Sequence, residues 1–395
     1  MLAVSDSPAL DEVRIDGLVC LCHLRWSFVW QRPQQILTRL ARRTDVVVVE
    51  EPEIAVDADS PSLRSRRTDG LTVLTPVLPA RAGQGWGFHD STNPAVAELV
   101  GDYLTAAGWD RPGRRNAVWY YTPMAVGATP ESIPFTTTIY DVMDELANFK
   151  GAPIDIKDRE RSLLEAADLV LTGGPSLYAA RADLHPRVSC DPSGVEITHF
   201  SKARSHTVAP TDIASLPRPI VGFYGVIDER LDIELLAGIA SARPGWSFVL
   251  IGPVVKIDPV ALPSLPNIHY LGMRDYSQLP AYLAGFDVAI LPFARNDATR
   301  FISPTKTLEY LAGGVPVVST PIRDVVDLYG DVVAIADGVD AFVAAIDDLV
   351  DEPPESRAAR DRAAAGVLSR YEWDAIVDRI WSEIVTTSLE LQGAP

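Results

Sequence analysis

Short runs of β-branched and other apolar residues alternate with helical stretches along almost the whole chain. Alternation of this kind is typical of parallel sheets whose strands are joined by helical crossovers. The runs fall into two sets, so we expect two such sheets. The expected strands are 17–23, 45–50, 71–75, 117–122, 136–141, 168–172 and 187–190 in the first set, and 218–224, 247–251, 267–271, 287–291, 315–319 and 332–335 in the second.

The length of 395 residues also favours two domains of ordinary size. Between the two sets of runs, residues 205–219 are polar and contain three prolines, which is typical of an interdomain linker. The resulting division is an N-terminal domain at 1–205, a linker at 206–217, a C-terminal domain at 218–370 and a final helix at 371–395.

The composition is that of a globular protein, with 47% hydrophobic and 22% charged residues. A formal net charge of -18 argues against nucleic acid as a partner. No apolar run approaches the ~20 residues of a membrane span, and residues 1–6 lack the features of a signal peptide. We therefore expect a cytoplasmic location. Cys20, Cys22 and Cys190 fit buried thiols better than disulfides or zinc ligands.

Basic runs occur at 39–43, 64–67 and 111–115, all in the expected N-terminal domain. Such runs usually form solvated faces. The alternative is peripheral contact with anionic lipid or a lipid diphosphate at the inner face of the cell membrane, since each clustered basic residue gains about 1 kcal/mol near such a surface.

The segment 301–320 combines a helix start with a misplaced cation. Ser303 is a good N-cap, Pro304 suits the first helical position, and the periodic apolar residues end at a double glycine, 313–314. Lys306 then falls in the first turn, where the helix dipole disfavours a positive charge by roughly 0.3 to 1 kcal/mol. A bound phosphate would offset that cost, so the segment predicts an anion-binding site.

Five segments together resemble the GT-B glycosyltransferases, and specifically the retaining glycosyltransferase family 4. The segment 303–318 is similar to the donor-binding helix of that family and the strand after it. The segments 24–35 and 141–146 look like those of a bacterial subgroup associated with cell-surface polysaccharide synthesis. The other two segments are 221–225, which closes a strand, and 287–292.

This resemblance implies an α/β fold of the GT-B type, in which two Rossmann-like β/α/β domains face a central cleft and the C-terminal helix crosses back to the N-terminal domain. It implies transfer of a sugar from a nucleoside diphosphate sugar, by family habit a UDP-sugar, to a glycan or lipid-linked acceptor. Retention of configuration and a role in cell-surface polysaccharide or glycoconjugate biosynthesis are part of the same expectation. The donor would bind the C-terminal domain and the acceptor the N-terminal domain.

One position departs from the family pattern. The family's motif has two glutamates eight positions apart, and here Glu309 occupies the later position while Phe301 stands at the earlier one. In the family the later glutamate bonds the nucleotide ribose and the earlier one contacts the donor sugar. The resemblance therefore implies that ribose recognition is kept and that sugar recognition is altered.

Lys306 and Arg230 are the candidate catalytic cations, because negative charge builds on the departing diphosphate during glycosyl transfer. The alternative for Lys306 is a plain surface pair with Glu309, three residues on. The alternative for Arg230 is pairing with Asp228 or Glu229. The two glycines among the candidates would let the backbone approach the donor, and the serine could instead simply cap the helix. The expected donor-binding residues are Gly222, Gly225, Arg230, Arg300, Ser303, Thr305, Lys306, Thr307 and Glu309.

Acceptor-binding residues are expected where strand ends of the first sheet face the cleft. Trp30, Arg32 and His89 are the candidates, and His23, which ends the first expected strand, is a weaker one. A lone histidine is more often a satisfied structural group. The stem of Arg32 could instead pack on Trp30.

Two carboxylates, Asp141 and Asp144, directly follow an expected strand. Either could orient or deprotonate an acceptor hydroxyl, so both are candidate catalytic residues. Asp144 could instead be the N-cap of a short helix.

No metal and no cofactor are expected, because the sequence has no clustered His, Asp and Glu ligands. Asp57-Ala58-Asp59 has the Asp-x-Asp spacing that could hold a metal against the diphosphate, but it lies in a polar loop of the first domain, so we discount it. Two other functions stay open. One is a catalytically silent nucleotide-sugar-binding protein, which is compatible with phenylalanine at position 301 in place of the family's glutamate. The other is a non-hydrolysing nucleotide-sugar epimerase with the same two-domain architecture.

Overall fold

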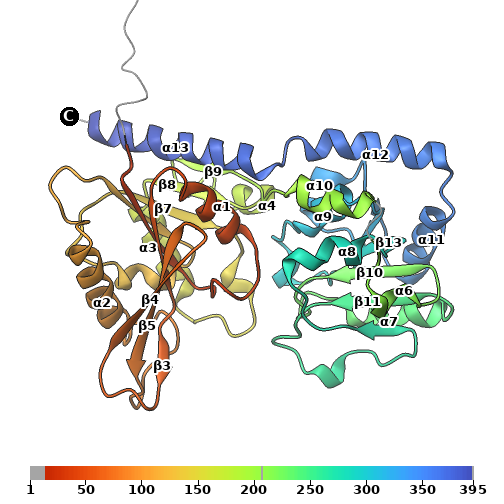
Figure 1. Ribbon diagram of the computed structural model, residues 1–395, viewed down its shortest axis with the longest axis horizontal. Coiled ribbons are helices and arrows are strands. Elements are labelled where there is room, and N and C mark those ends of the chain that lie inside the picture. Colours follow the sequence, from red (N-terminus) through yellow and green to blue (C-terminus); the bar gives the residue numbers. More distant parts are fainter. Residues whose placement is uncertain (1–13, 206–207, 394–395) are drawn as a thin grey trace, which may run out of the picture.

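The computed structural model describes residues 14–205 and 208–393. The expectations for the signal-peptide region, the start of the first domain, the first two linker residues and the last two residues lie outside the described residues. Figure 1 shows two α/β bodies side by side, joined by one crossing of the chain and by long helices at the C-terminal end. The part built on the first sheet is called the N-terminal domain below, and the part built on the second sheet the C-terminal domain.

The described strands of the first sheet are β1 (Gly17–Cys22), β2 (Asp45–Glu50), β3 (Glu53–Ala55), β4 (Ser62–Thr68), β5 (Leu71–Pro79), β6 (Asn116–Tyr120), β7 (Phe135–Val142), β8 (Leu169–Thr172) and β9 (Val188–Cys190). Their order is β3-β5-β2-β1-β6-β7-β8-β9, with β4 paired to the other edge of β5. All these pairs are parallel except β4 with β5.

The sequence prediction missed β3 and β4. β4 pairs with β5 through a turn at Asp69 and Gly70, whose φ angles of 51° and 83° are both left-handed. This is the hairpin turn that Asp-Gly favours. Most residues of β4 are exposed, so no apolar alternation marks the strand in the sequence.

The described strands of the second sheet are β10 (Ile220–Tyr224), β11 (Ser247–Ile251), β12 (Ile268–Tyr270), β13 (Val288–Leu291), β14 (Val317–Ser319) and β15 (Ala334–Ile335). They are all parallel, in the order β12-β11-β10-β13-β14-β15. The expected fold class, two Rossmann-like sheets, is therefore confirmed.

The described α-helices are α1 (Arg32–Leu40), α2 (Asn93–Ala106), α3 (Ile156–Ala166), α4 (Pro175–Ala179), α5 (Ile197–Phe200), α6 (Thr211–Ala214), α7 (Ile233–Ala242), α8 (Leu279–Leu283), α9 (Lys306–Ala312), α10 (Arg323–Tyr329), α11 (Val339–Val350), α12 (Pro354–Leu368) and α13 (Trp373–Gly393). In β1, Val19 and Leu21 face an apolar layer shared with α2 and α3. Leu18 and Cys20 face the opposite layer, which contains residues of α1 and α13. Burial on both faces explains why the first sheet reads as apolar runs.

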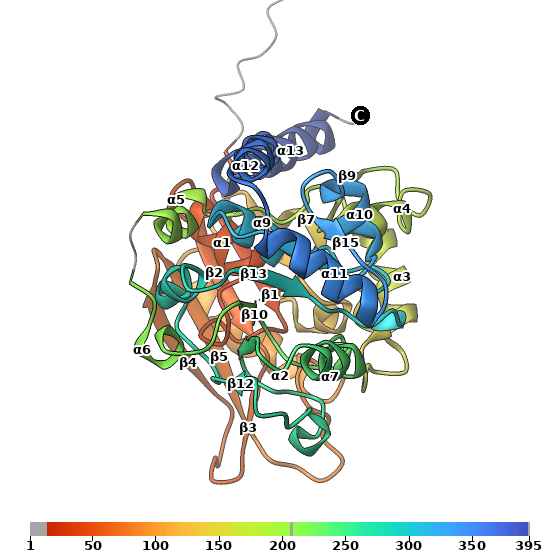
Figure 2. The same ribbon diagram turned by 90° about the vertical axis from the view of Figure 1, so that its right-hand side faces the viewer.

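The last helix returns to the first sheet. Both Figure 1 and Figure 2 place α12 and α13 along one edge of the molecule, and α13 lies over the N-terminal domain. Trp373, Ile376, Ile380 and Ile384 of α13 are buried in the same apolar layer as β1 and α1. The expected crossing of the C-terminal helix is therefore present.

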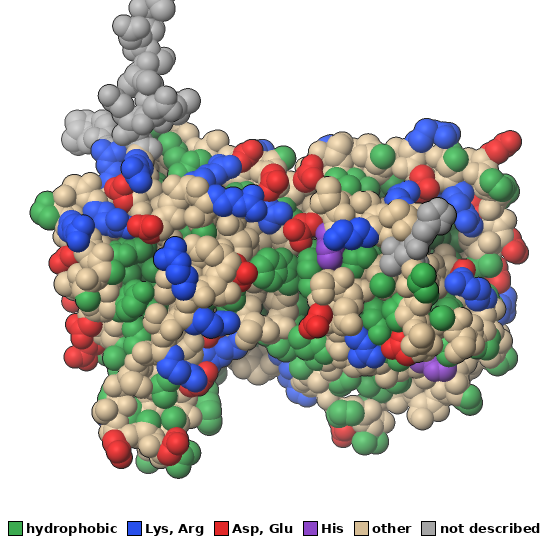
Figure 3. All heavy atoms as spheres, viewed as in Figure 1, with side chains coloured by type: hydrophobic (Ala, Val, Ile, Leu, Met, Phe, Trp, Pro, Cys, Tyr) green, Lys and Arg blue, Asp and Glu red, His purple; other side chains and the backbone are tan. Residues whose placement is uncertain are grey.

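Four arginines of the basic runs are paired with carboxylates. Arg39 and Arg43 pair with acidic residues of α13, Arg64 pairs with Glu53, and Arg114 pairs with Asp45. On the face seen in Figure 3, Lys and Arg side chains are scattered among Asp and Glu. This distribution fits solvated faces, and membrane contact stays a prediction. Among the described helices, none is long and apolar enough to span a bilayer.

Candidate functional site

A cavity of about 460 Å³ lies between the two domains. The N-terminal domain lines it with the loop 26–32 and with residues near the ends of several strands. The C-terminal domain lines it with the loops after β10, β11 and β13 and with the start of α9. This is the crevice at the carboxyl ends of parallel strands where ligands bind in such sheets.

The helix α9 begins at Lys306, later than expected. The carbonyl of Pro304 accepts from the N–H of Thr307, and the carbonyl of Thr305 accepts from the N–H groups of Leu308 and Glu309. Thr305 is the cap, so the prediction of Ser303 as N-cap is wrong. Ser303 instead packs against Gly174 of the N-terminal domain. A Cβ added at Gly174 would lie 2.8 Å from the Cβ of Ser303. Ser303 and Thr305 both line the cavity.

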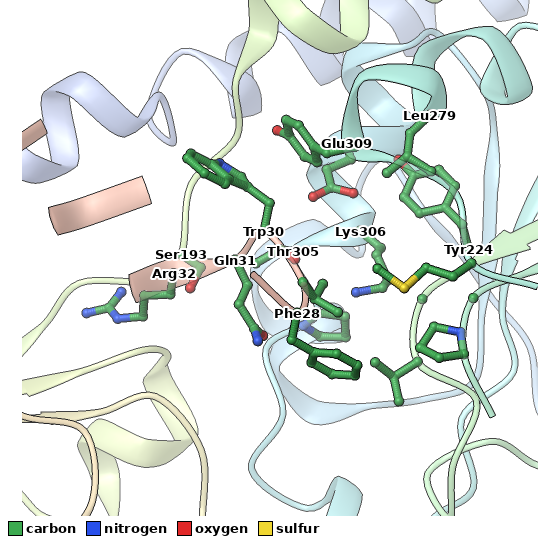
Figure 4. Close-up of a pocket in the computed structure, with 18 of the residues that line it drawn as sticks. Phe28, Trp30, Gln31, Arg32, Ser193, Tyr224, Leu279, Thr305, Lys306 and Glu309 are labelled. Carbon is green, nitrogen blue, oxygen red and sulfur yellow. The ribbon is translucent and has the colours of Figure 1, made fainter. Parts of the chain in front are cut away.

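Lys306 extends its amine into the cavity, as Figure 4 shows. Within the part of the chain that the structure describes, the amine has no hydrogen bond and no ion pair, and the alternative surface pair with Glu309 is not formed within 4 Å. Burial lowers the pKa of Lys306, and the nearby Glu309 carboxylate opposes this shift. An unpaired, partly desolvated cation facing a cavity is chemically suited to bind an anion.

Two glycines behave differently. Gly225 has a φ of 149°, and a Cβ there would lie 2.2 Å from Cε of Lys306, so glycine at this position leaves room for the lysine. Gly222 does not line the cavity. Its Cα faces the ring of Phe286, which a Cβ added there would meet at 2.2 Å. The expectation that Gly222 admits the donor is therefore corrected: it admits a packed aromatic ring.

The α9 helix is fixed to β10 by a tyrosine. The hydroxyl of Tyr310 accepts from the backbone N–H of Tyr224 at 2.9 Å and donates to the carbonyl of Tyr224 at 3.3 Å. Glu309, on the same helix, points its carboxylate into the cavity (Figure 4). Burial raises the pKa of Glu309, while Lys306 opposes the shift.

Arg230 both lines the cavity and pairs with Asp228. Its Nε donates to both Asp228 oxygens, at 2.9 Å and 3.1 Å, and its Nη2 donates to Oδ2 at 2.8 Å. Burial opposes the charge, yet Asp228 keeps the pKa of Arg230 raised. The pairing expected as an alternative therefore exists, and it holds the guanidinium at the cavity wall.

Asp144 lines the cavity from the N-terminal side. The short helix after it, Leu146–Asn148, has Glu145 as its cap, so the capping interpretation of Asp144 is wrong. Its carboxylate makes no hydrogen bond or ion pair among the described residues. Burial raises its pKa, and Arg230, Lys256 and Lys306, all on the other domain, oppose the shift.

Asp141 and Arg32 form a fully buried ion pair beneath the cavity. Nε of Arg32 donates to both Asp141 oxygens at 3.0 Å, and Nη1 donates to the carbonyl of Asp191 at 2.6 Å. The side chains are 0% and 2% exposed. Asp141 does not line the cavity, and Figure 4 shows Arg32 pointing away from its centre. Arg32 itself is among the lining residues, so its contact with the acceptor stays a prediction, as does a direct role of Asp141. The pair also anchors the start of α1.

Other predicted residues lie outside the cavity. Arg300 is exposed, with its guanidinium 5.2 Å from the ring centroid of Phe301, and Thr307 is fully buried. His89 is exposed and bonds Ser91. None of these side chains lines the cavity in this structure, so their contacts with donor or acceptor stay predictions. His23 also lies outside the lining, and burial lowers its pKa to about 4.

Phe301, at the position where the resemblance expects a sugar-binding glutamate, packs against the apolar core of the N-terminal domain. It does not line the cavity, although Ile302 and Ser303 beside it do. The substitution therefore adds an apolar contact between the domains.

Several lining residues were not predicted. In the loop 26–31, Trp26 and Phe28 join the expected Trp30, and their rings form one wall; Trp26 and Trp30 have centroids 6.4 Å apart. The β4–β5 hairpin, which was not predicted, adds further residues to the cavity wall. The Asp-Gly turn could have revealed this hairpin. Its lining residues are Arg66, Thr68 and Asp69.

Comparisons with known proteins agree with this geometry. A family model described as glycosyl transferase-like matches residues 232–382. A curated relative, "Putative teichuronic acid biosynthesis glycosyltransferase TuaH" of Bacillus subtilis (strain 168), is 26% identical over 242 residues. That alignment covers 55% of this chain and 58% of the relative, so the chain matches little more than half of the relative's length.

Among solved structures, sucrose-phosphate synthase from Thermosynechococcus elongatus is similar with a TM-score of 0.67 at 16% identity, covering 93% of this chain and 98% of that one. An E. coli structure titled as trehalose-6-phosphate bound with UDP-2-fluoro glucose has a TM-score of 0.69 at 12% identity, covering 94% and 99%. At these identities the likeness shows the fold. The fold matches over most of the chain, and the glycosyl transferase-like match covers residues 232–382, so the protein is similar to the GT-B glycosyltransferases.

Proposed function

We propose that the protein transfers a sugar from a nucleoside diphosphate sugar, with a UDP-sugar favoured, to a glycan or lipid-linked acceptor. The observation that carries this proposal is the unpaired amine of Lys306 in the interdomain cavity, beside Gly225 and near Arg230. A diphosphate would give that amine the anionic partner that it lacks.

In the proposed reaction, the bond between the anomeric carbon and the diphosphate oxygen breaks, and its electron pair leaves with the diphosphate. Lys306 and Arg230 would stabilise the charge that develops there. Glu309 would accept hydrogen bonds from the ribose, as the resemblance implies. The remaining proposed donor contacts are Gly225, Ser303 and Thr305, which line the same wall.

The acceptor oxygen then bonds the anomeric carbon, and its proton passes to Asp144 or to a phosphate oxygen. Asp144 suits either orientation or proton uptake because its carboxylate is unpaired and burial raises its pKa. Retention of configuration is proposed from the resemblance, and closure of the domains would exclude water.

We further propose a role in cell-surface polysaccharide biosynthesis, which the name of the teichuronic acid relative supports. The acceptor would bind the N-terminal domain and the donor the C-terminal domain. Peripheral contact with a membrane belongs to this proposal, because a lipid-linked acceptor would be presented there.

A thermal-shift panel of nucleoside diphosphates and their sugars tests the donor. We expect one base to raise the melting temperature, because a ligand at 100 times its dissociation constant stabilises the folded state by about 2.7 kcal/mol. No shift with any nucleotide would overturn the proposal. An epimerised donor in the absence of acceptor would favour the epimerase, and binding without transfer across a broad acceptor panel would favour a silent binding protein.

Transfer should survive a chelator. The two cations at the cavity, Lys306 and Arg230, can offset the diphosphate charge themselves. The measurement is the transfer rate before and after EDTA. Loss of activity that magnesium or manganese restores would contradict the expectation.

A further inference from the structure

The wall of the cavity formed by the N-terminal domain carries a second set of unpaired polar groups. It is made by the loop 26–31 and by the edge hairpin β4–β5. None of the donor contacts proposed above lies there. This wall therefore faces the other substrate.

The wall is held in place by hydrogen bonds. The indole N–H of Trp26 donates to Oδ2 of Asp69 at 3.1 Å, and the backbone N–H of Trp26 donates to Glu50 at 2.7 Å. The amide of Gln34 donates to the carbonyl of Trp26 at 3.0 Å. Trp26 is only 5% exposed, so the loop is packed against the hairpin.

Three groups on this wall are free to bind a ligand. Oδ2 of Asp69 already accepts from Trp26 and from Thr68, whereas its Oδ1 accepts no hydrogen bond among the described residues. Arg66 has neither a hydrogen bond nor an ion pair within the described chain. Phe28 is 38% exposed beside them.

The chemistry of these groups selects a ligand class. A guanidinium fork matches a carboxylate or a phosphate in two parallel hydrogen bonds. A carboxylate oxygen with no partner accepts from a hydroxyl. Aromatic surface with a few placed polar groups is typical of small-ligand sites. A sugar that carries an anionic group satisfies all three groups.

We propose that the acceptor ends in an anionic sugar, with its carboxylate or phosphate on Arg66, a hydroxyl on Asp69 and one ring face against Phe28. This inference rests on the proposed transferase function and adds the class of its acceptor. Arg66 is then the residue that determines acceptor specificity.

The hairpin supplies a matched control. Side chains alternate along a strand, so Arg66 and Thr68 share the face that lines the cavity, and Arg67 points the other way. Arg67 is exposed and does not line the cavity. Arg66→Ala and Arg67→Ala therefore remove the same charge from one strand, and only the first removes it from the site.

The test measures binding to the full-length protein saturated with UDP, using calorimetry or ligand-observed NMR. The probes are methyl glucuronide for a carboxylate, glucose 6-phosphate for a phosphate, and methyl glucoside as the neutral sugar. We expect one anionic probe to bind at least about tenfold more tightly than the neutral one. Arg66→Ala should abolish that preference, Arg66→Lys should restore part of it, and Arg67→Ala should leave it unchanged.

Equal binding of all three probes, no binding of any of them, or equal losses in the two alanine variants would overturn the inference. UDP binding separates this failure from failure of the proposed function. If UDP or another nucleoside diphosphate still raises the melting temperature, only the acceptor class is wrong. If no nucleotide binds, the transferase proposal fails first.

Discussion

Replacing Lys306 with alanine should lower kcat/KM for sugar transfer by a factor of about 100 to 1000, which is the usual cost of removing one preorganised group that stabilises transition-state charge. The free protein should melt at the same temperature or slightly higher. The amine has no partner to lose among the described residues, and both its burial and its place at the start of α9 disfavour its charge. Steady-state kinetics and a melting curve measure the two effects.

Arg300→Ala is the matched control for this variant. Arg300 lies six residues earlier, is exposed and does not line the cavity, so its loss should change kcat/KM little. Equal losses in the two variants would mean that general charge steers the donor, and an unchanged rate in Lys306→Ala would refute the role of the amine. Because burial lowers the pKa of Lys306, donor affinity of the wild type should also decline with rising pH below the pKa of a free lysine.

Asp141→Ala should lower the free energy of unfolding of the N-terminal domain by about 3 to 5 kcal/mol, because it leaves the Arg32 guanidinium buried without its carboxylate. Arg32→Ala should lower the free energy of unfolding by a similar amount, because it leaves the Asp141 carboxylate buried without the guanidinium. The loop 26–31, which Arg32 follows directly, should also lose order, so acceptor binding should weaken. Urea unfolding, followed by tryptophan fluorescence, measures the change in stability.

The double variant Arg32→Met with Asp141→Leu distinguishes a pair from two independent groups. Replacing both charges with apolar side chains removes the unpaired charge as well as the bond, so the double variant should be more stable than either single variant. Losses that simply add would show that the two residues act separately and that the ion pair does not fix the loop.

Most strands of both sheets could be predicted because parallel strands covered on both faces must be apolar. β4 could not be predicted this way, since an exposed edge strand such as Arg64 to Thr68 obeys no apolar pattern. The residues that it brings to the cavity were missed with it. Its turn residues, Asp69 and Gly70, were the one local signal of the hairpin.

The candidate site was predicted best where local chemistry was unusual. The lysine at a helix start and the carboxylate at 144 both lie in the cavity. The burial of Asp141 could not be predicted because burial depends on tertiary packing. The same strand end carries Asp141 into a pair with Arg32, 109 residues away, and leaves Asp144 without a partner among the described residues. Ser303 was misassigned because an interdomain contact competes with capping.

The packing of α13 on the first sheet links the two ends of the chain. The apolar layer that holds β1 and α1 is closed by Trp373, Ile376 and Ile380, which follow the whole of the second sheet in the sequence. A growing chain therefore carries an uncovered face on its first domain until the second domain and α13 have been made. Cutting the protein at the linker would leave that face open for good, so its two halves are not independent units.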